Sequence, residues 1–198
     1  MINKLALIGV GLIGASLARA LRDAGHVQEV IGYGRGLANL QRAVELGVVD
    51  RIETSLSAAV RDADMVVLAT PVGCMGEILG AIAPYLARDA VVTDVGSVKG
   101  TIAVAARAAL GEKLTGFVPG HPIAGTERTG VEASFSSLFV GRRVVLTPLP
   151  ETSAEALARV RAMWQAAGAE VVSMSVEHHD AVLAATSHLP HLLAYALV

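Results

Sequence analysis

The chain has very little cysteine and few aromatic residues. Only one of its 198 residues is a cysteine, and phenylalanine, tryptophan and tyrosine together make up 4%. The single cysteine, Cys74, cannot form an internal disulfide, which suits the reducing cytoplasm, and its apolar helical surroundings predict a packing role. Because aromatic side chains are scarce, Ala, Val, Leu and Ile must build the core, which favours close packing of helices on a sheet.

The chain also lacks an excess of one charge and a long apolar run. Lysine and arginine number 16 against 18 aspartates and glutamates, so the composition does not suggest a nucleic acid partner. No uninterrupted apolar run reaches the roughly 18 residues that a membrane-spanning helix needs. With 53% hydrophobic residues the chain can bury a substantial core, as a globular cytoplasmic enzyme does.

The most informative motif is a glycine cluster near the N-terminus. An apolar run over residues 5–8 predicts a β-strand that leads into G-x-G-x-x-G and then into a helix. In this order Gly9 permits a tight turn, Gly11 lets the backbone approach phosphates, and Gly14 lets the helix pack closely on the strand. The helix N-terminus adds free N–H groups and the positive end of a dipole. The motif therefore predicts a dinucleotide site.

A signal peptide is the alternative interpretation of the same segment. Lys4 followed by an apolar run and the small-residue pattern at 18–20 superficially resembles one. Three glycines at phosphate-binding spacing fit that interpretation poorly. Residues 28–33 also predict a second strand at the distance expected of a β-α-β unit, which favours the dinucleotide site.

Strand-like and helix-like segments alternate along the rest of the chain. Repeated alternation of this kind predicts a Rossmann-type doubly wound, mostly parallel sheet, in which buried strands are continuous apolar runs. We expect further strands over residues 64–71, 90–95, 114–118, 142–147 and 170–174, and helices or helical turns over residues 37–46, 55–60, 74–86, 99–110 and 154–167.

The pattern changes near Val176 to one long helix, residues 176–198, interrupted by Pro190. No Gly, Asn or Pro stop signal follows it. We therefore expect residues 1–174 to form the dinucleotide-binding domain. Residues 175–198 would be the first helix of an all-helical substrate and dimerisation domain that is truncated here, although a frayed C-terminal helix stays an alternative.

Ligands of open parallel sheets bind at the carboxyl ends of the strands. The position that carries an acidic residue in NAD-binding sites is Gly34, and Arg35 follows it. A guanidinium can bind a 2′-phosphate, so we expect NADP as cofactor; if Arg35 only stacks on adenine, NAD is accepted as well. The expected cofactor-binding residues are Gly9, Gly11, Leu12, Ile13, Gly14, Gly34, Arg35, Thr70, Pro71, Asp94 and Gly96.

Two further residues near strand ends suggest chemistry. His121 lies between glycines and beside a proline, in what we expect to be a rigid loop, and a histidine there can accept a hydroxyl proton as a hydride leaves the same carbon. Alternatively, its ring ties the loop to nearby carbonyls. Ser97 could hydrogen-bond the same hydroxyl or cap the helix that follows.

Four segments, residues 9–14, 94–100, 120–127 and 186–191, resemble in this order the prephenate/arogenate (cyclohexadienyl) dehydrogenases of tyrosine biosynthesis. The resemblance implies oxidative decarboxylation of prephenate to 4-hydroxyphenylpyruvate, of arogenate to tyrosine, or of both, with hydride transfer to NAD(P). It also implies that His121 is the catalytic histidine and that Ser97 shares its hydrogen bond to the ring hydroxyl. The substrate-binding residues that it implies are His188, His191, Thr126 and Glu127.

In that family a second domain continues past Val198 and supplies the homodimer interface and an arginine for the substrate carboxylate. No residue of this chain can be assigned that arginine's role. A β-hydroxyacid dehydrogenase or pyrroline-carboxylate reductase stays an alternative, although the lysine pattern of the former is not found. A nucleotide-sensing module would not need a rigid histidine beside Ser97. We expect no metal site, because the histidines at 178, 179, 188 and 191 fall on different helix faces.

Overall fold

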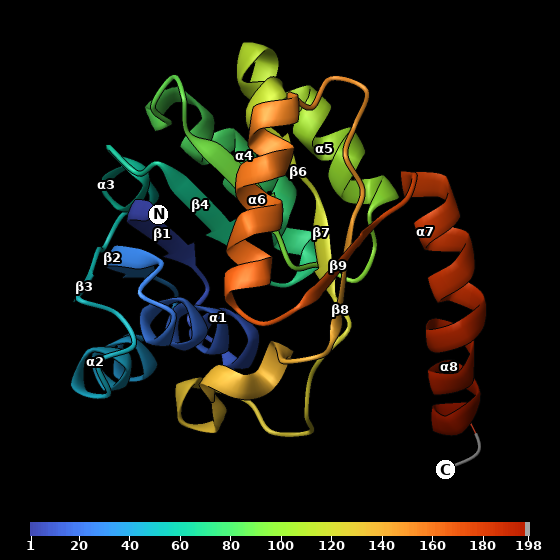
Figure 1. Cartoon of the computed structure of the whole chain (residues 1–198), viewed down its shortest axis with the longest axis horizontal. Coiled ribbons are helices and arrows are strands. Elements are labelled where there is room, and N and C mark those ends of the chain that lie inside the picture. The colour runs from blue at the N-terminus through green and yellow to red at the C-terminus, as the bar shows by residue number, and fades with distance from the viewer. Residues whose placement is uncertain (197–198) are drawn as a thin grey trace.

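The computed structural model describes residues 1–196, apart from the side chains of His188 and His191. Its main sheet has six parallel strands in the order β3-β2-β1-β4-β5-β6 (Figure 1). This order confirms the Rossmann-type class, and its switch point lies between β1 and β4. The strands are β1 (Ile2–Ile8), β2 (Val27–Tyr33), β3 (Arg51–Ile52), β4 (Met65–Leu68), β5 (Val91–Asp94) and β6 (Phe117–Val118).

Helices cover both faces of this sheet, as the alternation along β1 requires. Leu5 and Leu7 pack in one cluster with α1 and α6, whereas Ala6 and Ile8 pack in another with α3, α4 and α5. The helices are α1 (Leu12–Asp23), α2 (Leu37–Glu45), α3 (Leu56–Val60), α4 (Val72–Ile82), α5 (Gly100–Leu110) and α6 (Ala154–Ala166), with 3₁₀ helices at Ala83–Tyr85, Gly111–Gly116, Val131–Ala133 and Ser136–Phe139.

A separate three-stranded sheet was not expected. It contains β7 (Gly120–Pro122), β8 (Arg143–Leu146) and β9 (Glu170–Ser173), with β7 antiparallel to β8. The prediction that 142–147 and 170–174 extend the main sheet was therefore wrong. The prediction of a loop around His121 was also wrong, because His121 lies on β7 and pairs with Val145 of β8. Glycine and proline are rare in strands, so the sequence does not predict β7, and the strand is identified only by its pairing with β8. The strand predicted over 114–118 also begins later, because residues 111–116 are 3₁₀ helical.

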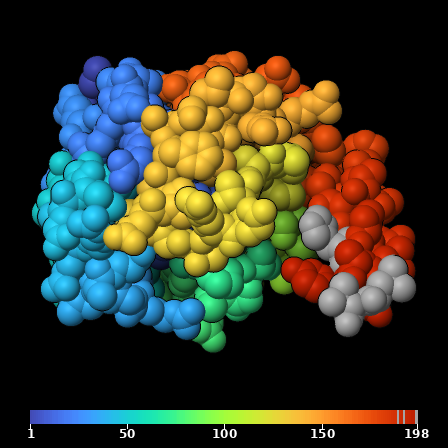
Figure 2. Space-filling model, turned by 90° about the horizontal axis from the view of Figure 1, so that it is seen from below, coloured from blue at the N-terminus to red at the C-terminus, as the bar shows by residue number. Residues whose placement is uncertain are grey.

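The segment between β7 and β8 packs across α1 and α2. The Phe135 N–H donates to Ser16 Oγ over 3.1 Å, and Arg19 Nε donates to Ser134 Oγ over 2.9 Å. Figure 2 shows this face, with the segment (yellow) beside the first helices (blue) and the C-terminal helices (red) at the edge. The segment therefore closes over the end of the sheet where the glycine loop lies.

The C-terminal helix is irregular where Pro190 was expected to disturb it. α7 (Val176–Leu183) passes through a π-helical turn (Ala184–His188) into α8 (Leu189–Ala196). Proline has no N–H for the helix ladder, and a π turn accommodates such a break. On α8, Leu192 and Tyr195 are 66% and 81% exposed. No helix in the part of the chain that the structure describes is long and apolar enough to cross a membrane.

Candidate active site

The glycine loop between β1 and α1 has the geometry that the motif predicts. Gly9 has φ +102°, and a Cβ there would lie 2.4 Å from the Ala69 carbonyl oxygen. A Cβ on Gly14 would lie 2.4 Å from the Gly9 oxygen, so α1 packs directly on the turn. A Cβ on Gly11, in contrast, would meet nothing within 4 Å. The first and third glycines are thus needed for packing, and the second leaves open space beside the backbone.

The loop presents the N-terminus of α1 to that space. Gly11 is the N-cap residue, no side chain caps the helix, and its first turn carries no acidic residue. The N–H groups of the first turn and the positive dipole end can therefore receive an anion.

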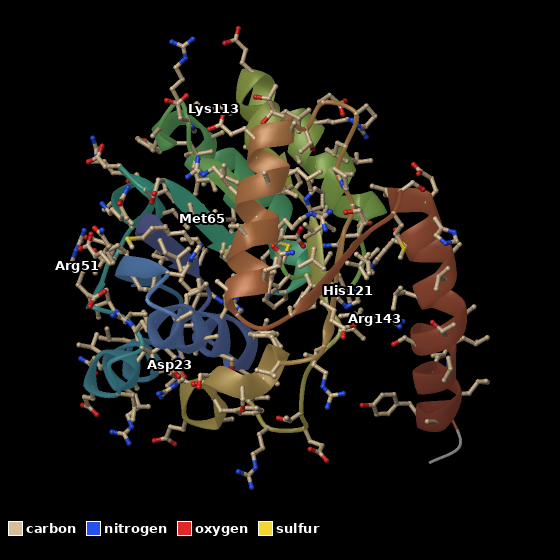
Figure 3. The ribbon with its side chains drawn as sticks, in the orientation of Figure 1. Asp23, Arg51, Met65, Lys113, His121 and Arg143 are labelled. Atoms are coloured by element: carbon tan, nitrogen blue, oxygen red, sulfur yellow. The ribbon has the colours of Figure 1, made fainter. Side chains whose placement is uncertain are left out.

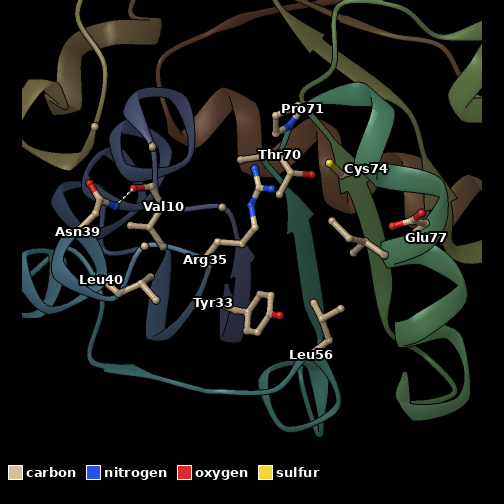
Figure 4. Close-up of a pocket in the computed structure, with 17 residues that line it drawn as sticks. Val10, Tyr33, Arg35, Asn39, Leu40, Leu56, Thr70, Pro71, Cys74 and Glu77 are labelled. Carbon is tan, nitrogen blue, oxygen red and sulfur yellow. Dashed lines mark hydrogen bonds between the residues drawn. The ribbon is translucent and has the colours of Figure 1, made fainter.

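These features border a cavity of about 530 Å³ (Figure 4). Thr70 lines it, and Thr70 Oγ1 is buried with no hydrogen-bond partner among the described residues, as expected of an atom that meets a ligand. Arg35 projects into the cavity and makes no ion pair or hydrogen bond to any other described side chain. The predicted residues that line the cavity are Gly9, Gly11, Gly34, Arg35, Thr70 and Pro71.

Other lining residues were missed or misjudged. Cys74, for which only a packing role was predicted, is half-buried on α4 and also lines the cavity. Asn39 on α2 was missed; its Nδ2 donates to the Val10 oxygen over 2.7 Å and its Oδ1 accepts the Val131 N–H over 3.1 Å. Asn39 thereby ties the glycine loop to the segment after β7. Of the predicted set, Leu12, Ile13, Gly14, Asp94 and Gly96 are not among the lining residues.

The first two glycines of the motif allow a matched test. Gly9→Ala should lower the free energy of unfolding by about 3 kcal/mol, because the methyl group overlaps backbone and φ is positive. Gly11→Ala should lower it by about 1 kcal/mol or less, the effect of a poorer N-cap. Gly11→Ala should nevertheless weaken NAD(P) binding at least about tenfold, by filling the open space. Urea unfolding and calorimetry measure both; equal stability losses would contradict the assignment.

Asp94, expected at the cofactor, instead belongs to a buried network at the end of β5. Its carboxylate accepts hydrogen bonds from Lys99 Nζ and from the N–H groups of Gly96 and Gly120. Lys99 Nζ also donates to the Gly120 oxygen over 2.7 Å. Burial lowers the pKa of Lys99 below its ordinary value, and the Asp94 charge offsets this only in part. The N–H and the carbonyl oxygen of Gly120, the residue before His121, are therefore both hydrogen-bonded to this ion pair.

His121 contacts a histidine that the sequence offered only as a rejected metal ligand. Its Nδ1 lies 2.9 Å from Nε2 of His179 on α7, and that ring is fully buried. His179 Nδ1 lies 2.7 Å from Asp180 Oδ1. The two carboxylate oxygens of Asp180 also accept hydrogen bonds from the N–H groups of Lys99 and Gly100 at the start of α5, over 2.9 and 2.8 Å.

The surroundings of Asp180 favour its ionised form. Burial alone would raise its pKa, but the hydrogen bonds from Lys99, Gly100 and His179 outweigh burial and hold the pKa below its ordinary value of 3.8. The stability that the carboxylate contributes is therefore fully present above pH 3.8 and is lost as the pH falls through the lower, folded-state pKa.

His121 also lines a second cavity of about 800 Å³ beside α7. Figure 3 shows His121 with Arg143 on the side of the small sheet that faces the C-terminal helices. Thr126 lines this cavity, whereas Glu127 is exposed and is not among its lining residues. The predicted His188 and His191 side chains lie outside the described residues. The other lining residues include Pro122, Phe135, Leu138, Arg142, Leu183, Thr186 and Ser187.

Ser97 lies between the end of β5 and the start of α5, but it does not cap that helix. It is exposed, and the N-cap residue of α5 is Lys99, whose N–H bonds to Asp180. The capping alternative was therefore wrong. Among the described residues, no group of three or more His, Cys, Asp or Glu side chains is placed to hold a metal.

Comparisons with known proteins agree with this geometry. A family model described as the nucleotide-binding domain of prephenate dehydrogenase matches residues 17–173. A cyclohexadienyl dehydrogenase of Zymomonas mobilis is 41% identical over 196 residues, which cover 99% of this chain and 66% of that protein. The chain spans 49 to 53% of the length of three further curated relatives.

Solved structures are similar over the whole described fold. Prephenate dehydrogenase from A. aeolicus, in complex with hydroxyphenyl propionate and NAD+, has a TM-score of 0.93 at 39% identity and is covered over 68% of its chain by 100% of this one. Synechocystis arogenate dehydrogenase has a TM-score of 0.88 at 38% identity, with 98% of this chain covering 67% of that one.

Proposed function

Because the chain belongs to the prephenate dehydrogenase family, we propose that the protein oxidatively decarboxylates prephenate, arogenate or both, in tyrosine biosynthesis. The observation that carries the proposal is His121, which lines a cavity of about 800 Å³ on a strand held to the nucleotide-binding sheet. A histidine so fixed is suited to remove a hydroxyl proton.

The residues of the first cavity fit a dinucleotide. Gly11 leaves room for a pyrophosphate, the N-terminus of α1 can receive its charge, and Thr70 Oγ1 lacks a partner among the described residues. When bound, NAD(P) supplies the hydride acceptor. The chain's own residues hold it at the carboxyl edge of β1 and β4, which is where open sheets of this order bind such ligands.

At the second cavity, His121 takes the proton of the ring hydroxyl as hydride leaves the same carbon. Loss of the ring carboxylate as carbon dioxide then makes the ring aromatic, which supplies a large driving force. The protein therefore has mainly to orient the substrate and place one base. Ser97 and Thr126 are proposed to contact the substrate, with Glu127 at the mouth of its site.

A spectrophotometric assay of the full-length protein tests the function. We expect reduction of NAD(P) that depends on prephenate or arogenate, measured for each substrate with each cofactor. Binding of a cofactor without turnover of either substrate would contradict the proposal and favour a nucleotide-sensing role.

We propose NADP as the preferred cofactor. Gly34 places no carboxylate at the end of β2, and the Arg35 guanidinium has no other side-chain partner among the described residues. A charge-assisted contact to a 2′-phosphate would contribute about 1.5 to 3 kcal/mol. A Cβ on Gly34 would meet only Leu40, at 3.6 Å, so an aspartate can be introduced there without a clash.

The double variant Gly34→Asp with Arg35→Ala should weaken NADP binding by about 10- to 100-fold and shift preference towards NAD. Calorimetry is the suitable measurement, because Trp164 is buried in the core and does not line the cavity. Arg61→Ala, which removes an exposed arginine elsewhere, is the matched control. If the unchanged protein binds NAD at least as tightly as NADP and the double variant alters neither, Arg35 does not bind the phosphate.

We further propose a cytoplasmic homodimer, joined through a helical domain that residues 175–198 begin. The exposed apolar side chains of α8 support that assembly. The division at residue 174 stays a prediction.

A further inference from the structure

When both histidine rings are neutral, the hydrogen bonds that link His121, His179 and Asp180 have one consistent direction. Asp180 Oδ1 accepts the Lys99 N–H and Oδ2 accepts the Gly100 N–H, so both carboxylate oxygens face donors that cannot reverse. An ionised carboxylate carries no proton. The 2.7 Å contact between Asp180 Oδ1 and His179 Nδ1 therefore requires the proton to be on His179 Nδ1.

This assignment fixes the next hydrogen bond. A neutral imidazole with its proton on Nδ1 has an acceptor at Nε2. His179 Nε2 lies 2.9 Å from His121 Nδ1, so His121 must donate from Nδ1. Its own Nε2 then holds a lone pair.

We propose that His179 and Asp180 are positioning residues that hold His121 in the Nδ1–H tautomer and so make Nε2 the base atom. Neither residue needs to touch substrate or cofactor. The role of Nε2 as base rests on the proposed function, whereas the tautomer follows from the contacts within this chain.

Lys99 anchors this arrangement at both ends. Its backbone N–H bonds to Asp180, and its side chain bonds to the Gly120 oxygen, one residue before His121. β7 and α7 are thus fixed to the same residue at the start of α5. The His121 and His179 rings meet edge to face, 5.2 Å between centroids, and the fully buried His179 ring has little room to turn.

Long-range ¹H–¹⁵N correlation spectra of histidine-labelled protein identify which ring nitrogen carries the proton, with single histidine variants for assignment. At a pH where both rings are neutral, we expect Nδ1–H tautomers for His121 and His179. An Nε2–H tautomer at His121 would overturn the proposal. This measurement needs no substrate, so it stands even if the proposed reaction fails.

Kinetics of the full-length protein test the consequence. His179→Leu removes the acceptor and should lower kcat about 10- to 100-fold, the range for loss of an outer partner of a functional histidine, with little change in the KM for NAD(P). His179→Gln should retain most of the activity, because its amide can donate to Asp180 and accept from His121. The control His178→Leu changes the exposed neighbour on α7.

Two results separate the positioning role of His179 from the proposed dehydrogenase function. If His179→Leu folds and lowers kcat no more than His178→Leu, the positioning role is wrong while the dehydrogenase function stands. If His179→Leu does not fold, His179→Gln decides: a kcat as low as that of His121→Asn with the Nδ1–H tautomer retained, or a normal kcat with that tautomer lost, would contradict the proposal.

Discussion

His121→Asn should lower turnover with prephenate or arogenate by about 10²- to 10⁴-fold, the usual contribution of a positioned general base. Asparagine is close in size and keeps a polar group near His179 Nε2, but it cannot accept a proton at neutral pH. Because His121 lines the second cavity and not the first, NAD(P) affinity should change little. Steady-state kinetics of the full-length protein and calorimetry with each cofactor measure the two effects.

The matched control is His178→Asn, the same replacement at an exposed histidine. It should leave both turnover and cofactor affinity unchanged. If turnover of His121→Asn falls by less than about fivefold, another group is the base, since a positioned base contributes much more. A large loss of cofactor affinity would instead indicate that His121→Asn disturbs the fold around β7.

The parts of the fold that could be predicted are those set by local sequence. Residues 5–8 of β1 and all of β4 are buried, continuous apolar runs, and Gly9 and Gly14 stand where a side chain would meet backbone. Such constraints act over a few residues, so a single sequence shows them. The repeated β-α alternation then predicts a doubly wound parallel sheet, although the order of its six strands is seen only in the structure.

The site residues that sequence did not predict depend on contacts between distant segments. His179 lies 58 positions from His121, and Asp180 lies 81 from Lys99, yet each pair is hydrogen-bonded. On a helix, a histidine beside an aspartate is common and carries no signal of its own. The one signal in the sequence is that His179 and Asp180 are polar on a helix whose next turns are apolar.

Lys99→Met should lower the free energy of unfolding by about 3 to 5 kcal/mol, because it leaves the buried Asp94 carboxylate without its cation. Methionine is unbranched like lysine and one heavy atom shorter, so lost packing contributes less than the unpaired charge. The Gly120 oxygen also loses its donor. Urea unfolding at constant pH measures the loss, and Lys4→Met, at a lysine whose ammonium hydrogen bond is exposed, is the control with an expected loss of about 1 kcal/mol or less.

Adding Asp94→Asn to Lys99→Met identifies the cause of that loss. The amide oxygen can still accept the N–H of Gly96 or Gly120, but no charge stays buried, so the double variant should be more stable than Lys99→Met alone. If the second change destabilises further, the lysine acts through packing and not through charge. If the free energy of unfolding falls no more in Lys99→Met than in Lys4→Met, the ion pair does not hold β7. The placement of His121 must then depend on its pairing with β8.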